Sequence, residues 1–460
     1  MAKKELDMTN GNLFQKIIIY SVPIMLTSIL QLLYNACDLM VVGKFASNGE
    51  EALAAVSSTG SLINLITSLF MGLSVGASVV FAQNYGKGDY EKANKVVHTA
   101  VIVSTAASVI ISVVGIVFAK QFLTWMDSPE NVIDLSTTYM QIFFAGTFFN
   151  LLYNFVSALV RASGDTKRPL YILTVAGLIN VILNLFFVIA FDMSVEGVAL
   201  ATIISQAFSA ITIMYLLIKE EGALNFSFKK LAFDKDSFFK MVVIGLPSGI
   251  QGSFFSISNM TIQTAVNGFG DIVMSGNGTA SNIEGFVYVG MNAIHQAAVN
   301  FTSQNYGAKK FDNIKKTLIY SLIIVFIVGE VMGMAFYLLG PWILRLYTDD
   351  SQVILYALNR MKYVCAFYVF CGIMDVLVGS IRGMGYSTIP MVVSLIGVCA
   401  FRVFWVKVIF ENYKTLSSLY ISYPISWVIT SIALIICLIF VFNKVKNSLV
   451  EPKQEIQEMI

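Results

Sequence analysis

Apolar runs of about twenty residues recur along the whole chain, and each is long enough to cross a bilayer as one helix. Twelve such runs are found, at approximately 14–42, 57–83, 96–119, 136–160, 169–191, 195–218, 238–266, 278–303, 316–339, 355–381, 389–410 and 417–443. The chain is 57% hydrophobic and only 13% charged, whereas soluble domains carry about 25% charged residues. Because almost nothing is left for a soluble domain, the sequence predicts an all-α integral membrane protein with twelve transmembrane helices.

The basic residues are distributed unevenly between the two ends of these runs. If the N-terminus is cytoplasmic, 22 Lys and Arg residues fall on the cytoplasmic side and only 5 fall in the opposite loops. Cytoplasmic loops of membrane proteins carry an excess of Lys and Arg, whereas basic residues that merely solubilise loops would show no sidedness. We therefore expect a multi-pass protein of the plasma membrane with both termini in the cytoplasm.

Two segments of the first half recur in the second half at an offset of 221 residues. The first pair is AQNYGKGDYEKANKVV (82–97) and SQNYGAKKFDNIKKTL (303–318), and the second is RASGDTKRP (161–169) and RGMGYSTIP (382–390). Each half contains six runs, so the two halves have the same orientation in the membrane. They are expected to form two parallel six-helix lobes related by a pseudo-two-fold axis along the membrane normal, with a central cavity between them.

The first helices of the two halves align at an offset of 224, which pairs Pro23 with Pro247 and Asn35 with Asn259. Each proline lies inside a helical run and removes a backbone donor, so Pro23 and Pro247 are predicted hinges. The expected domains are an N-terminal lobe (1–218), a cytoplasmic linker (219–237), a C-terminal lobe (238–443) and a cytoplasmic tail (444–460).

A polar stripe in the first run includes an ionisable group. Gln31, Tyr34 or Asn35, and Asp38 recur at helical spacing and therefore share one face. A carboxylate inside a membrane helix costs about 2.5–3.5 kcal/mol on insertion scales, so such groups usually mark ion or substrate pathways. Gln31 and Asn35 are open to a second interpretation, in which they only hydrogen-bond neighbouring helices.

Further polar residues lie in later runs. Asn180 and Asn184 are one helical turn apart and either coordinate a hard cation together with a carboxylate or hydrogen-bond a neighbouring helix. Glu284 and Asp375 either line a cavity of the second half or form an internal salt bridge, for instance to Arg402. The predicted substrate-cavity residues are Gln31, Tyr34, Asn35, Asn259, Gln263, Glu284, Tyr288, Asn292 and Asp375.

Several function classes lack their motifs in this chain. The sequence has no phosphate-binding G-x-x-x-x-G-K-[ST] loop, so we expect no nucleotide to drive it directly. It has no H-E-x-x-H or G-x-S-x-G motif and no cluster of Cys and His, so we expect neither an enzyme nor a bound cofactor. The energy for transport would come from an ion gradient, unless transport is passive.

The residues above resemble the multidrug and toxic compound extrusion (MATE) transporters. The resemblance rests on the two parallel halves, the QNYG turns after the second and eighth runs, and the segments RASGDTKRP and RGMGYSTIP, and it covers essentially the whole chain. It implies export of amphipathic, often cationic compounds by alternating access, in exchange for Na⁺ or H⁺.

The same resemblance assigns the coupling residues. Family positions for cation coupling fall on Asp38, Tyr139, Asn180, Asn184 and Thr202, with an implied Na⁺ site at Asp38, Asn180, Asn184 and Thr202. Many members carry a second acid where this chain has Asn184. The NorM branch carries a glutamate where this chain has Phe255, so the chain is closer to the DinF-like prokaryotic members.

The alternative is a flippase for a lipid-linked saccharide or another lipid. Such relatives generally have additional helices and a strongly cationic cavity, whereas the predicted cavity here is acidic and rich in amides. An importer of the major facilitator type would carry a basic loop after the second run, where this chain has QNYGKGD. The expected partners are small amphipathic organic cations and the lipid bilayer, without nucleic acid or nucleotide, and the protein is expected to be a monomer.

Overall fold

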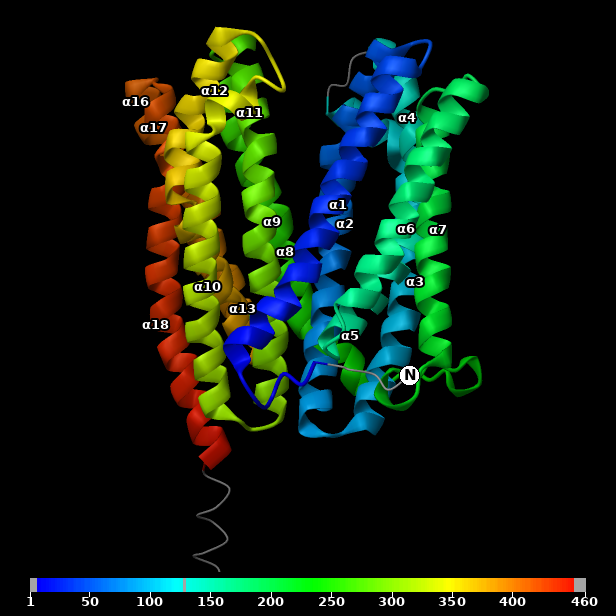
Figure 1. Ribbon diagram of the computed structural model, residues 1–460, viewed down its shortest axis with the longest axis vertical. Helices are drawn as coiled ribbons and strands as arrows, with labels where there is room; N and C mark the ends of the chain where they lie inside the picture. Colours follow the sequence, from blue (N-terminus) through cyan, green and yellow to red (C-terminus); the bar gives the residue numbers. More distant parts are fainter. Residues whose placement is uncertain (1–5, 127–129, 451–460) are drawn as a thin grey trace, which may run out of the picture. The chain divides into compact units, whose positions relative to one another are not determined.

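The computed structural model describes residues 6–126 and 130–450, and every regular element in these ranges is a helix (Figure 1). In these ranges ten helices are long and apolar enough to cross a membrane, and a bent pair brings the number to eleven. The long helix α9 (Asp271–Gly307) is not among them, although it contains the run expected at 278–303, because it carries many polar residues. The predicted all-helical class is confirmed.

The chain folds as two compact units. Unit 1 contains Leu6 and Leu26–Gly249, and unit 2 contains Asp7–Met25 and the described residues from Ile250 onward. The helices α1 (Leu13–Phe45) and α8 (Lys235–Asn267) therefore each contribute to both units. In both helices the division falls two residues after the internal proline, which is Pro23 in α1 and Pro247 in α8.

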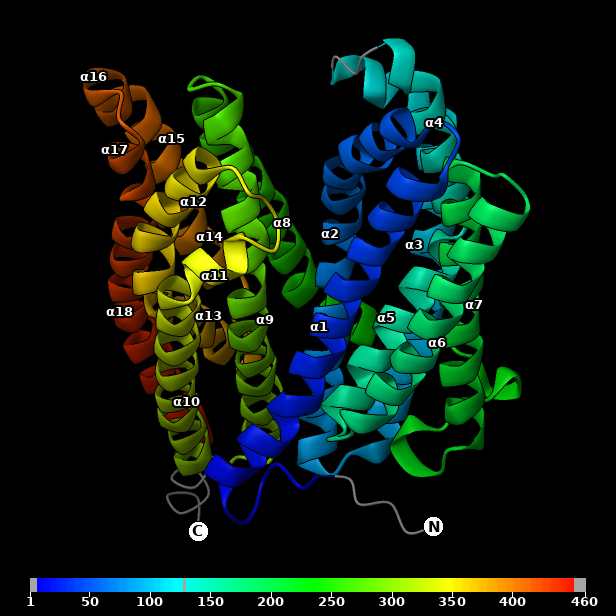
Figure 2. The same cartoon turned by 45° about the horizontal axis from the view of Figure 1, so that its top comes forward.

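Unit 1 is a helical bundle in which α6 lies along α7 (Figure 2). Its elements besides parts of α1 and α8 are α2 (Gly49–Lys87), α3 (Tyr90–Trp125), α4 (Glu130–Ala145), α5 (Thr147–Ala162), α6 (Lys167–Leu185), the π-helix η1 (Phe186–Ala190), α7 (Val195–Lys219) and the short 3₁₀ turns η2 (Gly222–Leu224) and η3 (Phe228–Lys230).

One expected run in unit 1 is broken. The run at 136–160 consists of α4 and α5, which are bent by 48° at Gly146. A side chain at Gly146 would collide with Ile203 of α7, so the missing Cβ lets the break pack closely against the neighbouring helix. The expected span at this place is therefore a bent pair of helices and not one straight helix.

Glycines bring α2 and the first part of α8 into close contact. Gly72 and Gly76 of α2 face Gly245 and Gly249 of α8, with four-residue spacing on both helices. A Cβ at Gly76 would lie only 2.8 Å from the backbone nitrogen of Gly245, closer than real side chains approach. Small residues at this spacing allow membrane helices to pack backbone to backbone. The start of the second repeat is therefore fixed within unit 1.

The polar stretch between the two repeats is also ordered against unit 1. Asn94 Nδ2 of α3 donates to the carbonyl oxygens of Ala223 (3.2 Å) and Asn225 (2.6 Å). Phe226 is 1% exposed and stacks on the ring of His98, whose Nε2 accepts a hydrogen bond from the Ser227 amide. This part of the expected linker is held by side chains of α3.

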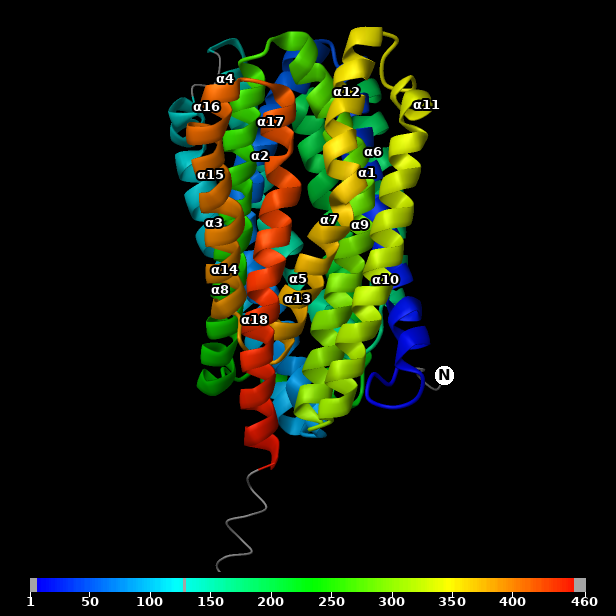
Figure 3. The ribbon, with the colours of Figure 1, turned by 90° about the vertical axis from the view of Figure 1, so that its left-hand side faces the viewer.

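Unit 2 is built around α9, which packs against α10, α12 and α13, while α13 packs against α18 (Figure 3). Its elements are α9, α10 (Phe311–Leu338), α11 (Gly340–Leu344), α12 (Ser351–Val364), η4 (Cys365–Phe367), α13 (Tyr368–Gly383), α14 (Thr388–Ser394), the π-helix η5 (Leu395–Ala400), α15 (Phe401–Trp405), the π-helix η6 (Val406–Phe410), α16 (Glu411–Tyr413), α17 (Leu416–Tyr420) and α18 (Ser422–Val450), together with parts of α1 and α8.

The QNYG turn of the second repeat holds the N-terminal segment. Asn305 Nδ2 donates to the Met8 carbonyl oxygen at 2.9 Å, and Asn313 Nδ2 donates to the Thr9 carbonyl oxygen at 2.7 Å. Met8 and Asn305 are both fully buried. This contact gives Asn305 a structural role that the repeat alone did not reveal.

Candidate functional site

The predicted coupling residues of the first half lie together inside unit 1. Asn184 Nδ2 on α6 donates to Asp38 Oδ1 on α1, and also to Asn180 Oδ1 at 3.3 Å. Asn180 Nδ2 lies 3.5 Å from Thr202 Oγ1 on α7. Tyr139 of α4 is 8% exposed and close enough to interact with the charge of Asp38. Four helices thus bring together all five residues, and we call them the Asp38 cluster.

The backbone around the cluster explains how these residues meet. Asn180 and Asn184 are one turn apart on α6, so their side chains follow one another along one face of the helix. The π-helix η1 begins two residues after Asn184, and such irregular turns are common at functional sites. Next to the cluster, the ring of Tyr34 covers Gly177 of α6, where a Cβ would collide with it.

One oxygen in the cluster lacks a hydrogen-bond partner among the described residues. Asn184 Oδ1 is fully buried and accepts no hydrogen bond from any residue that the structure describes, whereas buried polar atoms in proteins are nearly always paired. It belongs to the residue that donates to the Asp38 carboxylate. Carboxylate, amide and hydroxyl oxygens are the ligands of hard cations. The oxygens of this cluster, which carry one formal negative charge on Asp38, therefore suit one small cation or one proton.

The other polar residues of the first run lie outside this cluster. Gln31 and Asn35 are exposed and Tyr34 is half-buried, with its hydroxyl donating to the Thr174 carbonyl oxygen at 3.2 Å. None of the three hydrogen-bonds a residue of the Asp38 cluster in the described contacts. Their role in a substrate cavity stays a prediction.

In unit 2, Glu284 of α9 forms a buried ion pair with Arg360 of α12. Arg360 Nη2 and Nε donate to Glu284 Oε2 and Oε1 at 2.7 Å and 2.9 Å, and Arg360 Nη1 donates to Asn277 Oδ1 at 2.8 Å. Both ionised side chains are almost fully buried, at 4% and 6% exposure. Glu284 therefore forms an internal salt bridge, which was one of its two interpretations, and its partner is Arg360 and not Arg402.

Arg360 is a residue that the sequence analysis missed. It lies inside the apolar run at 355–381, where a base costs as much as an acid does. A search for bases as well as acids inside the runs would have singled out Arg360, although not its partner.

Asp375 of α13 has a different environment. It is 9% exposed, and its Oδ2 has no hydrogen-bond partner among the described residues. The nearby Arg382 uses Nη2 to donate to Gln251 Oε1 at 2.9 Å, and His295 Nδ1 lies 2.6 Å from the Asp375 backbone oxygen. In the described contacts Asp375 thus forms no salt bridge of the kind made by Glu284.

The remaining predicted cavity residues lie on α8 and α9. Asn259 is exposed and accepts a hydrogen bond from Arg402, and Gln263 Oε1 accepts one from Asn277 at 2.8 Å. Tyr288 is 40% exposed, and the partly exposed Asn292 accepts a hydrogen bond from Gln296 Nε2 at 2.9 Å. These four polar side chains have partly or fully exposed faces.

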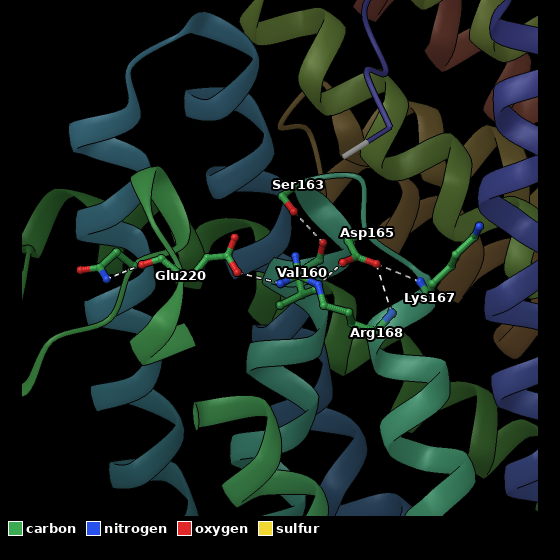
Figure 4. A network of polar contacts seen from close by, with 7 residues as sticks. Val160, Ser163, Asp165, Lys167, Arg168 and Glu220 are labelled. Carbon is green, nitrogen blue, oxygen red and sulfur yellow. Dashed lines mark hydrogen bonds and ion pairs between the residues drawn. The ribbon is translucent and has the colours of Figure 1, made fainter. Parts of the chain in front are cut away.

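The RASGDTKRP turn of the first repeat forms a separate polar network (Figure 4). The Asp165 carboxylate accepts from the backbone amides of Lys167 and Arg168 at 3.0 Å and 3.1 Å and also pairs with the Arg168 side chain. Arg168 Nη1 in turn lies 2.7 Å from Glu220 Oε2. Gly164 adopts a φ of +108°, which a residue with a side chain rarely adopts, so glycine is required at this turn.

The second repeat ties the equivalent turn differently. Gly385 has a φ of +94°, but Tyr386 stands in the place of Asp165 and Ile389 in that of Arg168. The Lys444 ammonium of α18 lies 5.4 Å from the centre of the Tyr386 ring. In both halves the turn is thus linked to the end of a later helix, by an ion pair in one and by a cation–π contact in the other.

Parallel repeats of membrane helices, with a lone carboxylate held among amides inside one of them, are typical of secondary transporters. The MatE family model matches residues 23–186 and 247–405, one match in each half. The chain therefore belongs to the MatE family, and it is a multi-pass membrane transporter and not an enzyme.

Curated relatives and solved structures agree with this assignment. The chain is 28% identical over 403 residues to the probable multidrug resistance protein YpnP of Bacillus subtilis, covering 88% of each chain. It is 27% identical over 422 residues to the probable multidrug resistance protein YoeA of the same organism, covering 90% of each. A crystal structure of MATE in complex with MaL6 has the same fold, with a TM-score of 0.90, 20% identity and coverage of 97% of this chain and 100% of that one.

Proposed function

We propose that the protein is a secondary active exporter that exchanges Na⁺ or H⁺ for amphipathic, often cationic compounds. The observation that carries this proposal is the Asp38 cluster, in which the carboxylate accepts a hydrogen bond from Asn184, whose buried Oδ1 lacks a partner among the described residues. The names of the relatives YpnP and YoeA, both probable multidrug resistance proteins, support the substrate class. Position 255 carries a phenylalanine and not the glutamate of the NorM branch, which supports grouping the chain with the DinF-like members.

The chemistry of the cluster suits exchange. Asp38 supplies one negative charge, so it binds one proton or one cation at a time. When neither is bound, the Asp38 carboxylate is charged, and the hydrogen bond from Asn184 stabilises it only in part. A charge among buried groups has a cost in free energy. Binding of the ion neutralises Asp38 and removes this cost, so the ion favours one state of the transporter over the other.

The direct test is efflux from inverted membrane vesicles that contain the protein. Ethidium-type dye is followed by fluorescence while a sodium gradient and a proton gradient are imposed separately. One of the two gradients is expected to drive dye movement, and an uncoupler specific to that gradient is expected to stop it. Dye movement that follows neither gradient would exclude coupled export.

The orientation in the membrane can be tested independently. Because the basic residues favour a cytoplasmic N-terminus, single cysteines near residues 165, 228 and 310 are expected to react with an impermeant thiol reagent only from the cytoplasmic side. Cysteines near residues 46, 125 and 272 are expected to react only from outside. Labelling of cysteines at Lys229 and Gly270 from the same side would contradict this topology.

A further inference from the structure

Arg402 is a buried cation that forms no ion pair with an acid in the part of the chain that the structure describes. It is 4% exposed, and its hydrogen bonds run to neutral groups, from Nε to Ser426 Oγ at 3.1 Å and from Nη1 to Asn259 Oδ1 at 3.2 Å. No carboxylate pairs with Arg402 among the residues that the structure describes. Glu284 forms its ion pair with Arg360 instead. A buried charge without a counterion is costly, so it calls for an explanation.

Aromatic rings partly offset this cost. The Arg402 guanidinium lies 4.2 Å from the centre of the Tyr423 ring and 5.8 Å from that of Trp427. The Arg360 guanidinium lies over the same Tyr423 ring at 5.3 Å. The group formed by Glu284, Arg360 and Arg402 therefore carries one net positive charge.

At the aligned position of the first half the internal repeat has no cation. At the offset of 221 residues, Arg402 corresponds to Val181 of α6, which lies between Asn180 and Asn184 in the chain. Tyr423 corresponds to Thr202, and Ser426 corresponds to Ser205. The first half thus has an aliphatic side chain at the aligned position, in the regular helix α6, whereas in the second half the π-helix η5 comes directly before Arg402.

The same correspondence places Arg402 at the counterpart of the Asp38 cluster. In the second half Ile262 aligns with Asp38 at the offset of 224 that relates the first helices, and Phe401 and Trp405 align with Asn180 and Asn184 at the offset of 221. Each cation ligand of the first half is therefore replaced by an apolar or aromatic residue, and a fixed cation is added. A site that binds a mobile cation in one half has become a site with a permanent cation in the other.

Arg402 is connected to an exposed polar face of α8. Asn259, Gln263 and Asn267 follow one another at four-residue spacing, and Asn259 and Asn267 are exposed. A face with three carboxamides is unsuited to lipid and is expected to meet water or a bound compound. Since Asn259 accepts from Arg402 Nη1, an acceptor that arrives at this face can replace Asn259 on the guanidinium.

We propose that Arg402 binds the carboxylate of zwitterionic or anionic amphipathic compounds, which it reaches beside Asn259 on the polar face of α8. The guanidinium offers a planar set of donors that matches a carboxylate in a two-point contact. The single net positive charge of the group matches a singly charged anion. The inference rests on the proposed transport function and extends its substrates to compounds that carry a negative group as well as, or instead of, a positive one.

The test compares two dyes that differ only in this group. Tetramethylrhodamine with a free carboxylate is a zwitterion, and its methyl ester is a cation with the same ring system. Binding of each dye to the purified full-length protein is measured by fluorescence polarisation without any ion gradient. The wild-type protein is expected to bind both dyes.

The variant Arg402→Gln is expected to weaken binding of the free carboxylate dye by about tenfold or more, and binding of the ester by less than about twofold. Arg402→Lys keeps the charge but loses the two-point contact, so it is expected to weaken the carboxylate dye alone, by a few-fold. Lys407→Gln removes an exposed positive charge close by in the chain and is expected to change neither dye.

The outcomes separate this inference from the proposed function. Binding of the ester but not of the carboxylate dye by the wild-type protein overturns the inference and leaves multidrug export intact. Equal losses for both dyes in Arg402→Gln and Arg402→Lys also overturn it, because they indicate a structural role. Failure of the wild-type protein to bind either dye contradicts both. If Arg402→Gln does not fold, Arg402→Lys decides.

Discussion

Asp38→Asn is expected to abolish gradient-driven dye efflux while leaving the protein folded and able to bind dye. Asparagine has nearly the shape of aspartate, and its oxygen can still accept the hydrogen bond that Asn184 Nδ2 donates to Asp38. It cannot release a proton or supply a negative charge, and Asn184 and Asn180 are neutral. The coupling residues would then hold no carboxylate, so efflux in vesicles should fall to the level of vesicles without the protein.

Two further variants sharpen this result. Asp134→Asn removes a carboxylate that pairs with Lys120 at an exposed place outside the cluster, and it is expected to leave efflux unchanged. Asn184→Asp adds a second acid beside Asp38 and is expected to strengthen sodium binding, because two carboxylates suit a hard cation better than one. Normal efflux by the Asp38→Asn protein would refute the proposed coupling.

Glu284→Gln is expected to lower the stability of the protein strongly, and by more than Asp38→Asn or Asp375→Asn. The change leaves Arg360, which is 6% exposed, without its only acidic partner among the described residues. Removing one member of a buried ion pair typically costs about 3–5 kcal/mol, since the other charge stays buried and unpaired. Tryptophan fluorescence during heating in detergent should show a clear fall in the unfolding temperature.

A double variant distinguishes this explanation from a loss of packing. Replacing the pair together, as Glu284→Gln with Arg360→Met, removes both charges and is expected to recover much of the lost stability. Asp375→Asn is the matched single change, because Asp375 forms no salt bridge in the described contacts and its loss should cost less. A double variant that is less stable than Glu284→Gln would mean that the ion pair is not the cause.

The sequence predicted the class of fold and the members of the Asp38 cluster for different reasons. The apolar runs and the repeat define the class because bilayer thickness fixes helix length. Periodicity alone placed Asp38 on a polar stripe with Gln31 and Asn35, which the structure leaves exposed and outside the cluster. It was the family resemblance that added Tyr139 and Thr202, which lie on other helices.

Other features were out of reach because they depend on contacts between distant parts of the chain. Glu284 and Arg360 are 76 residues apart, and nothing in the local pattern indicates that their helices adjoin. The break at Gly146 depends on the side chain of Ile203, and the docking of Met8 depends on Asn305. Hydrophobicity gives the length of a run, but its partners are decided by packing.

The two turns with positive φ, at Gly164 and Gly385, limit which segments could be swapped between the two halves of this chain. In the first half the turn is fastened by carboxylates and a guanidinium, and in the second by an ammonium over a phenol ring. Asp165→Tyr would leave Arg168 with Glu220 as its partner but without Asp165. Tyr386→Asp would give Lys444 a carboxylate in place of an aromatic ring. Each turn therefore depends on a partner in a later helix, which is Glu220 in the first half and Lys444 in the second. A chimera that transfers one turn without this partner would lose the contact between the turn and that helix.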